Sequence, residues 1–131
     1  MSTYTTTVPV RFRDVDAMGH VNNAVYATYL EQARTEYFRD VLDADLSSVS
    51  TVLASLSISF RRPVHLEDDS VDVEIDVTEI GESSVPMTYE LRTDDGVVAE
   101  AESVQVAVDE TGSSRPMPEA YRTAIESYHG L

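Results

Sequence analysis

Apolar and polar residues alternate along several short stretches of the chain, which is the period of a half-buried β-strand. The first stretch runs from Thr5 to Arg13, with Val8, Val10 and Phe12 on its apolar face. The same alternation returns in four later stretches: Val52–Arg61, Val71–Thr78, Val85–Leu91 and Val97–Val108. The pattern therefore predicts at least five strands.

Turn residues separate the later stretches. Pro63 ends the second strand, Gly81 lies between the third and the fourth, and residues 93–96 (TDDG) have the composition of a hairpin turn. Such short connections are typical of antiparallel neighbours. In the last stretch the apolar phase shifts between Ala101 and Val104, which predicts a bend there.

One long segment has the helical period instead. Its apolar residues recur at spacings of three and four: Tyr26, Tyr29, Leu30, Ala33, Tyr37 and Phe38. The polar residues between them fall on the rest of the helical wheel: Thr28, Glu31, Gln32, Arg34 and Thr35. This pattern predicts an amphipathic helix of about four turns. We expect it to start near Asn22 or Asn23, because asparagine is a good N-cap.

The remaining segments complete the order of elements. Residues 40–50 are polar and irregular and predict a loop, whereas residues 118–128 predict a short terminal helix. A helix with one apolar stripe and a meander with one apolar face bury both surfaces if the sheet curls around the helix. We therefore expect a single α+β domain over residues 1–131, an antiparallel β-sheet wrapped around one long central α-helix.

The charge of the chain is extreme. Its 131 residues include 24 Asp and Glu against 9 basic residues, all of them arginine, for a formal net charge of -15. A nucleic-acid partner is excluded, because binding phosphate backbones requires clustered positive charge. An acid-rich surface repels itself until salt screens it, so the composition favours a protein of a salt-loaded, halophilic cell. An acidic protein from a mesophile is the alternative.

The absence of cysteine and of long apolar runs excludes several kinds of site and location. Without cysteine there are no disulfides, thiolate metal sites or cysteine nucleophiles. The N-terminal MSTYTTTVPV lacks the basic start and apolar stretch of a signal, and no apolar run is long enough to span a bilayer. We expect a soluble cytoplasmic protein without a membrane partner.

The segment RDVDAMGHVNNAVY, residues 13–26, crowds acids, amides and a histidine before the helix. A calcium loop would require oxygen ligands where Met18 and Val25 stand. A phosphoryl-transfer aspartate pair would require a doubly wound sheet and a glycine-rich loop, which the chain lacks. A metal site on Asp16 and His20 would lack a third ligand. These three interpretations are disfavoured, and the sequence predicts no metal.

Purely structural roles remain open for the same segment. Asp14 and Asp16 could accept turn hydrogen bonds, Gly19 could supply a left-handed residue, and Asn22 or Asn23 could cap the helix. Each role is common, so residue types and spacing do not decide between a turn and a catalytic loop.

A family resemblance favours the catalytic loop. RFRDVDAMGHVNNAVYATYLEQAR, residues 11–34, resembles the signature of hotdog-fold acyl-CoA thioesterases of the 4-hydroxybenzoyl-CoA thioesterase type. SISFRRPV, residues 57–64, is similar to a strand of that family, and ETGSSRPMP, residues 110–118, to its C-terminal tail. The resemblance covers most of the chain and implies a helix of roughly five turns wrapped by an antiparallel sheet.

The resemblance also implies roles for residues of the loop. The catalytic carboxylate of the family falls on Asp16, and the backbone amide that polarises the thioester carbonyl falls on Asn23, with Gly19 allowing the turn before it. His20 resembles the histidine of the plant acyl carrier thioesterases, but Met18 replaces the asparagine that precedes it there. A catalytic role and a positioning role for His20 both remain open, and no cofactor is implied.

The chemistry suits these residues. Thioester hydrolysis requires a nucleophile on one side of the carbonyl and positive potential on the other, and a helix N-terminus supplies the second. Asp16 would act as general base on water or as nucleophile. Arg61 and Arg62, the adjacent basic pair, would bind coenzyme A phosphates, or would pair with carboxylates such as Glu67 or Asp68.

The expected substrate is an acyl-CoA, hydrolysed to free acid and coenzyme A. Gly19, Asn22 and Tyr26 would lie beside it, although Tyr26 could equally belong to the core. A non-catalytic acyl-thioester binding domain and a hotdog hydratase or dehydratase are the alternatives. A sheet with an uncovered edge also predicts a homodimer or homotetramer.

Overall fold

The computed structural model describes residues 2–43 and 50–131 as an antiparallel sheet and two helices. In chain order the main elements are β1 (Tyr4–Pro9), α1 (Asn23–Leu42), β2 (Thr51–Phe60), β3 (Ser70–Asp76), β4 (Ser84–Thr93), β5 (Gly96–Ala107) and α2 (Glu119–His129). Two single-turn 3-10 helices, η1 (Phe12–Asp14) and η2 (Leu66–Asp68), lie in the connections. The predicted α+β class, the helix start and the terminal helix are confirmed.

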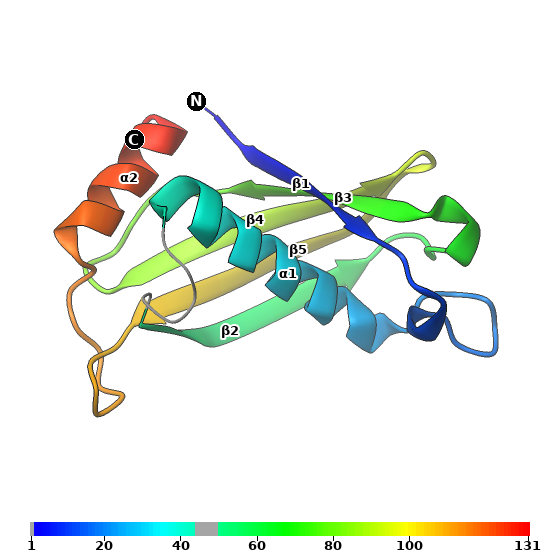
Figure 1. The fold of residues 1–131 in the computed structure, drawn as a ribbon, viewed down its shortest axis with the longest axis horizontal. Coiled ribbons are helices and arrows are strands. Elements are labelled where there is room, and N and C mark those ends of the chain that lie inside the picture. The colour runs from blue at the N-terminus through cyan, green and yellow to red at the C-terminus, as the bar shows by residue number, and fades with distance from the viewer. Residues whose placement is uncertain (1, 44–49) are drawn as a thin grey trace.

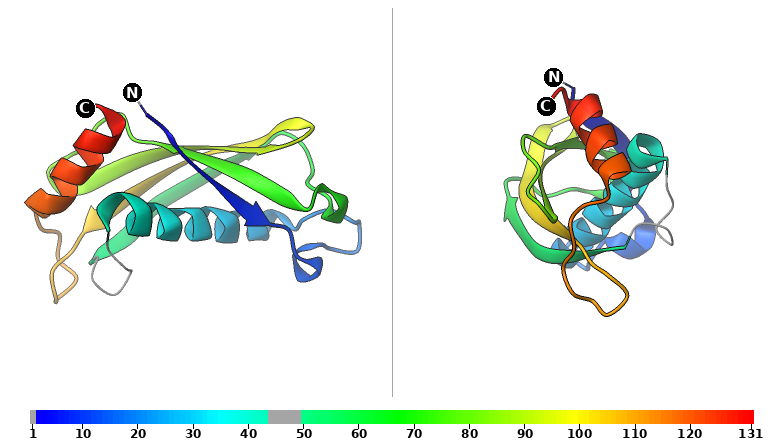
Figure 2. Two further views of the ribbon diagram at one scale, coloured as in Figure 1. Left: turned by 45° about the horizontal axis from the view of Figure 1, so that its top comes forward. Right: turned by 90° about the vertical axis from the view of Figure 1, so that its left-hand side faces the viewer.

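The sheet has five strands in the order β1-β3-β4-β5-β2, and every neighbouring pair is antiparallel. It curls around α1, as the end-on view in Figure 2 shows. Figure 1 shows the loop before α1 at one end of the molecule and α2 at the other. The order leaves β1 and β2 as the two edges of the sheet.

Helix α1 supplies the core side chains that the period predicts. Its buried apolar residues are Tyr26, Tyr29, Leu30, Ala33, Tyr37, Phe38 and Leu42. The helix has 20 residues and so is longer than the four turns expected, because Val41 and Leu42 continue its apolar face. It ends at Asp43, which is left-handed at φ 52°. Of the predicted loop over residues 40–50, positions 44–49 lie outside the described residues.

Arg34 departs from the predicted polar face of α1. Only 5% of it is exposed, and its Nη1 donates to the hydroxyl of Tyr89 on β4 at 3.3 Å. The aliphatic stem of an arginine packs well against apolar neighbours while its head finds a polar partner. The helical wheel therefore placed Arg34 on the wrong face of α1.

The first strand is shorter than predicted. Pairing with β3 ends at Pro9, although the amide of Val10 still donates to the carbonyl of Asp69 at 2.8 Å. The chain then enters η1, where the Arg11 amide donates to the Asp14 carboxylate at 2.9 Å. Phe12 consequently lies outside the core, with 82% of its surface exposed.

The phase shift from which a bend was predicted between Ala101 and Val104 is absent, because β5 pairs with β4 in unbroken register there. The strand keeps its phase by turning Ser103 and Gln105 inward, and the hydroxyls of Ser103 and Tyr89 lie 2.5 Å apart. The register instead shifts near Val98 against β4, and near Ala54 of β2 against β5. Ser103 thus occupies an inward position where the pattern required an apolar residue, and its hydrogen bond satisfies the buried hydroxyl.

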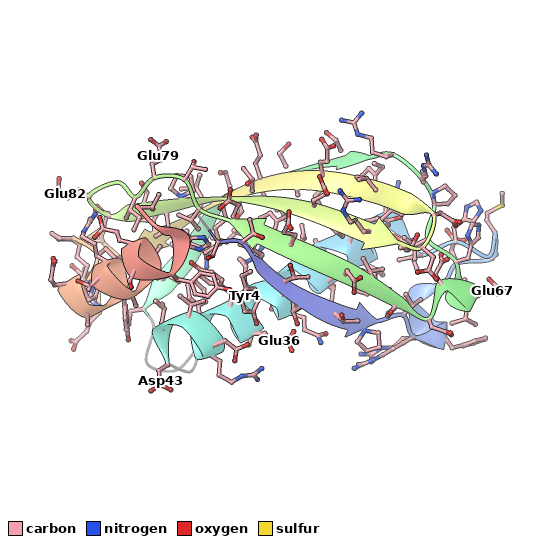
Figure 3. All side chains as sticks on the ribbon, turned by 90° about the horizontal axis from the view of Figure 1, so that it is seen from above. Tyr4, Glu36, Asp43, Glu67, Glu79 and Glu82 are labelled. Atoms are coloured by element: carbon pink, nitrogen blue, oxygen red, sulfur yellow. The ribbon has the colours of Figure 1, made fainter. Side chains whose placement is uncertain are left out.

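The end of the molecule opposite the loop is closed by α2. The Nε2 of buried His129 lies 2.9 Å from the hydroxyl of Tyr37, and its Nδ1 lies 2.8 Å from the carbonyl oxygen of Ser2. Tyr4 packs edge-on against Tyr37 beside these groups. Figure 3 shows Tyr4 where β1 passes α1, while the side chains of Asp43, Glu67, Glu79 and Glu82 project outward from the ribbon.

Candidate active site

The loop before α1 folds back on itself as a tight turn. The amide of Asp16 donates to the carbonyl of His20 at 2.8 Å, and the amide of Gly19 donates to the carbonyl of Asp16 at 3.0 Å. Gly19 has φ +81°, a conformation that other residues rarely adopt, so the turn requires glycine there. Val15 and Val21 pair across the base of the turn.

Only one oxygen of the Asp16 carboxylate accepts hydrogen bonds from this turn. Its Oδ1 accepts from the amides of Met18 at 2.9 Å and His20 at 3.3 Å. Its Oδ2 makes no hydrogen bond within residues 2–43 and 50–131. The side chain is therefore oriented by the backbone while one oxygen stays available to a ligand.

Asp14 has the structural role. Its Oδ2 accepts from the amide of Arg11 at 2.9 Å and from the hydroxyl of Tyr29 at 2.8 Å. Burial, followed by the bond to Asp14, raises the pKa of Tyr29 above its ordinary range. The first aspartate thus ties the loop to α1, and the second faces outward.

Helix α1 begins directly after the loop. Asn22 is its N-cap, and the side-chain oxygen of Asn22 accepts from the amide of Ala24 at 2.9 Å. The amide of Asn23 is the first of the helix, and the described part of the chain provides no acceptor for it. A free amide at the positive end of a long helix stabilises negative charge placed before it.

These groups meet at one cavity of about 550 Å³. Its lining residues are Asp16, His20, Val21, Asn22, Asn23, Tyr26, Phe60, Arg61, Arg62 and Pro63. All of the predicted site residues except Gly19 line this cavity. Gly19 lies within the turn, where its positive φ is required. The site therefore combines the loop, the first turn of α1 and the end of β2.

Tyr26 lies at the base of this cavity and is also part of the core. Its ring packs edge-on against Phe60, with centroids 4.9 Å apart, and its hydroxyl donates to the carbonyl of Arg62 at 3.4 Å. Burial raises its pKa. Phe60 is half exposed, and sequence patterns had assigned it only to a strand.

Arg61 and Arg62 line the opposite wall. The sequence-based alternative, pairing with surface carboxylates, holds for Arg61, although its partner is neither Glu67 nor Asp68. Arg61 pairs with Glu100 on β5 at 3.1 Å, and Nη1 of Arg62 donates to the carbonyl of Asp95 at 2.7 Å. Both are exposed, so each guanidinium retains donors that face solvent.

His65 lies beside the cavity without lining it, and the sequence patterns gave it no role there. It follows Arg61-Arg62-Pro63-Val64 directly, and its ring contacts the ring of His20, with centroids 5.0 Å apart. Adjacency to the arginine-proline segment was the available signal. No group of three or more histidine or acidic side chains suited to a metal gathers here or elsewhere in residues 2–43 and 50–131.

Comparison with known proteins identifies the family of the chain. Residues 10–125 match the family model of the thioesterase-like superfamily. The chain belongs to the thioesterase-like superfamily. Within the superfamily it is 30% identical over 109 residues to the Escherichia coli acyl-CoA thioester hydrolase YbgC, covering 78% of this chain and 79% of that protein.

Two further similar proteins match different shares of this chain. The match to the Bacillus subtilis protein YsmA is 29% identical over 83 residues, 63% of this chain and 56% of that protein. A thioesterase of Thermus thermophilus, solved with coenzyme A and zinc, superposes with a TM-score of 0.88 at 35% identity, covering 97% and 94% of the two chains. These similarities confirm the hotdog fold. Among the described helices, none is long and apolar enough to cross a membrane.

Proposed function

We propose that this protein hydrolyses an acyl-CoA thioester to a free carboxylic acid and coenzyme A. The observation that carries the proposal is the meeting of a free carboxylate oxygen of Asp16 and the free amide of Asn23 at one cavity. Membership of the thioesterase-like superfamily and the similarity to YbgC support it. Within the hotdog enzymes we propose the 4-hydroxybenzoyl-CoA thioesterase type, acting on a fatty or aromatic acyl group.

The reaction needs little from the protein beyond these groups. The thioester carbonyl oxygen accepts from the amide of Asn23, where the positive end of α1 stabilises the developing oxyanion. Asp16 takes a proton from water, whose oxygen bonds to the carbonyl carbon. The C–S bond then breaks, and the leaving sulfur takes the proton from Asp16, which restores the carboxylate. His20, beside Asp16 on the cavity wall, orients this water.

A covalent route uses the same residues. Asp16 would then attack the carbonyl carbon and form a mixed anhydride that water hydrolyses. A single turnover in ¹⁸O-labelled water tests for the covalent route. An unlabelled acid product, with the label in Asp16, identifies an anhydride that water attacks at the aspartyl carbonyl, whereas general-base catalysis labels the product.

Coenzyme A brings several negative charges to an acidic protein, so its phosphates require a local positive site. We propose that Arg61 and Arg62 provide it, since guanidinium groups match phosphate geometry. Salt would help by screening the remaining repulsion. For this reason we also propose that the protein works in the cytoplasm of a halophilic cell.

The protein should act as a homodimer or homotetramer. Strand β2 is an edge of the sheet, yet its side chains Val52, Leu53 and Phe60 are exposed, and Phe60 also lines the cavity. A second copy pairing at β2 would cover this apolar edge and complete the wall of the site.

Oligomeric state is testable by light scattering in concentrated salt. Leu53→Asp should weaken the dimer, because it places a charge on the apolar edge. Thr5→Asp, on the exposed face of the other edge strand β1, is the matched control and should leave the mass unchanged. A monomeric mass for the active wild-type protein would contradict the dimer.

Release of free thiol from a panel of aliphatic and aromatic acyl-CoAs, in concentrated salt, tests the activity itself. Asp16→Asn keeps an oxygen for the amides of Met18 and His20 but removes the base. We expect turnover to fall by roughly a hundredfold or more. Asp14→Asn should change turnover much less and lower stability more, because the Asp14 carboxylate holds Arg11 and Tyr29.

The alternatives give different results. A binding domain would bind acyl-CoA without releasing thiol, and a hydratase would consume an unsaturated acyl-CoA with its thioester intact. Equal turnover in the wild-type protein and Asp16→Asn, on the best substrate, would rule out the mechanism.

A further inference from the structure

A second histidine beside the site comes from a different part of the chain. His20 of the loop and His65 after β2 form an isolated antiparallel bridge. Beside it, the amide of Val21 donates to the carbonyl of buried Val64 at 2.7 Å. The two imidazoles meet edge to face, with centroids 5.0 Å apart and planes at 77°. The backbone thus brings these two rings together.

His65 is itself held by an acidic side chain. The Oδ2 of Asp68 accepts from the amide of His65 at 2.8 Å and lies 3.8 Å from its Nδ1. The Asp68 amide in turn donates to the carbonyl of His65 at 3.0 Å, which closes η2. The Asp68 side chain is 15% exposed, against 41% for that of His65, so the carboxylate is the more sheltered partner. Asp68 therefore fixes the backbone of His65 by a hydrogen bond and places its carboxylate on the Nδ1 side of the ring.

The ring of His20 has no comparable hydrogen bond. Its backbone amide and carbonyl bond to Asp16, but neither ring nitrogen bonds to the part of the chain that the structure describes. The ring lines the cavity, and its one described ring contact is His65. An edge-to-face pair has a preferred geometry, so this contact restricts the directions that His20 can take.

We propose that His65 and Asp68 are positioning residues that hold the imidazole of His20 toward the hydrolytic water. Asp68 orients His65, His65 supports the ring of His20, and His20 meets the water that Asp16 deprotonates. This order follows the logic of a catalytic base that is oriented by a third group. The inference rests on the proposed function, because it assigns His20 a part in hydrolysis.

The test uses variants of the full protein on its best acyl-CoA. His65→Ala should lower kcat by roughly 2- to 10-fold, the range that the energy of an aromatic pair corresponds to, with KM nearly unchanged. His65→Phe retains an aromatic ring and should recover most of the loss. Asp68→Asn should give a smaller decrease. Glu67→Gln, an exposed neighbour in the same turn, is the control and should have no effect.

A double-mutant cycle separates positioning from a general structural role. If His65 acts through His20, His65→Ala should cause no further loss of kcat in the His20→Ala background. Equal losses in both backgrounds would overturn the proposal. So would a His20→Ala variant with wild-type kcat, even though the role of Asp16 would then still stand.

A second measurement does not depend on activity. In nuclear magnetic resonance spectra, the ring protons of His20 should shift when His65→Ala removes the ring current of its neighbour. In His65→Phe, which retains an aromatic ring, the ring protons of His20 should keep nearly their wild-type chemical shifts. Unchanged His20 ring signals in His65→Ala would show that the contact is absent and would overturn the proposal, whether or not the protein hydrolyses thioesters.

Discussion

The outer face of the sheet carries a row of three glutamates that should make stability depend on salt. Glu74 of β3 is the direct cross-strand partner of Glu90 on β4, and Glu90 is the partner of Glu100 on β5. All three line one hollow on that face. Like charges directly opposite each other in a sheet are destabilising. Replacing the central residue, Glu90→Gln, removes both repulsions at once.

The magnitude follows from the register. Directly opposed side chains start about 5 Å apart, where two like charges in water repel by roughly 0.8 kcal/mol. Two such pairs therefore cost about 1.6 kcal/mol at low salt. Glu90 also pairs with Arg92, which offsets roughly 0.2 to 1 kcal/mol. The net gain from Glu90→Gln is about 0.6 to 1.4 kcal/mol, and it should vanish near 1 M salt, where the screening length is about 3 Å.

Thermal unfolding monitored by circular dichroism, from dilute buffer to molar potassium chloride, measures this difference. We expect Glu90→Gln to melt roughly 2 to 6 °C above the wild-type protein at low salt, with the curves converging as salt rises. Glu110→Gln is the control, since it changes the net charge equally in an exposed turn. If Glu90→Gln melts lower in dilute buffer, or shows the same salt dependence as the control, the reasoning is wrong.

Two further predictions concern substrate binding and alkaline pH. Replacing Arg61 and Arg62 with alanine should raise KM for acyl-CoA roughly 10- to 100-fold, the value of a lost charge-assisted hydrogen bond, and leave kcat nearly unchanged in steady-state assays. An unchanged KM would assign both arginines a structural role. Burial raises the pKa of Tyr4, Tyr29 and Tyr37 above the ordinary value. Their contribution to stability should be complete below about pH 10 and fall as pH rises further, because the unfolded chain ionises first. A free energy of unfolding that does not fall as pH rises above about 10 would contradict this.

Strand and helix identities were predictable because each apolar face is continuous in the sequence. Two of the errors occur where a polar side chain has an internal hydrogen-bond partner. Ser103 and Arg34 both contact the hydroxyl of Tyr89, so one buried tyrosine accounts for two misplaced residues. No local pattern reveals such a shared partner, because it depends on β4, β5 and α1 packing together.

The candidate site was predictable to the extent that it is local. Asp16, Gly19 and Asn23 lie within one turn and one helix start, so their spacing already determines how the backbone arranges them. Residue types did not distinguish the two aspartates. The resemblance gave Asp16 the catalytic role, and the bonds from Arg11 and Tyr29 to Asp14 give Asp14 a structural role. The contact of His65 with His20 could not be predicted from the sequence, because it depends on backbone pairing between segments more than forty positions apart.

Backbone hydrogen bonds, rather than the catalytic side chains, hold the site together. The loop is closed by Asp16 and His20 through main-chain atoms, and Val21 joins it to Val64 in the same way. A site built like this can lose a side chain at Asp16, His20 or His65 without losing the cavity, since most of the bonds that shape it remain. Substitutions at these three positions should therefore report on chemistry more than on folding, which is what makes kcat the informative measurement.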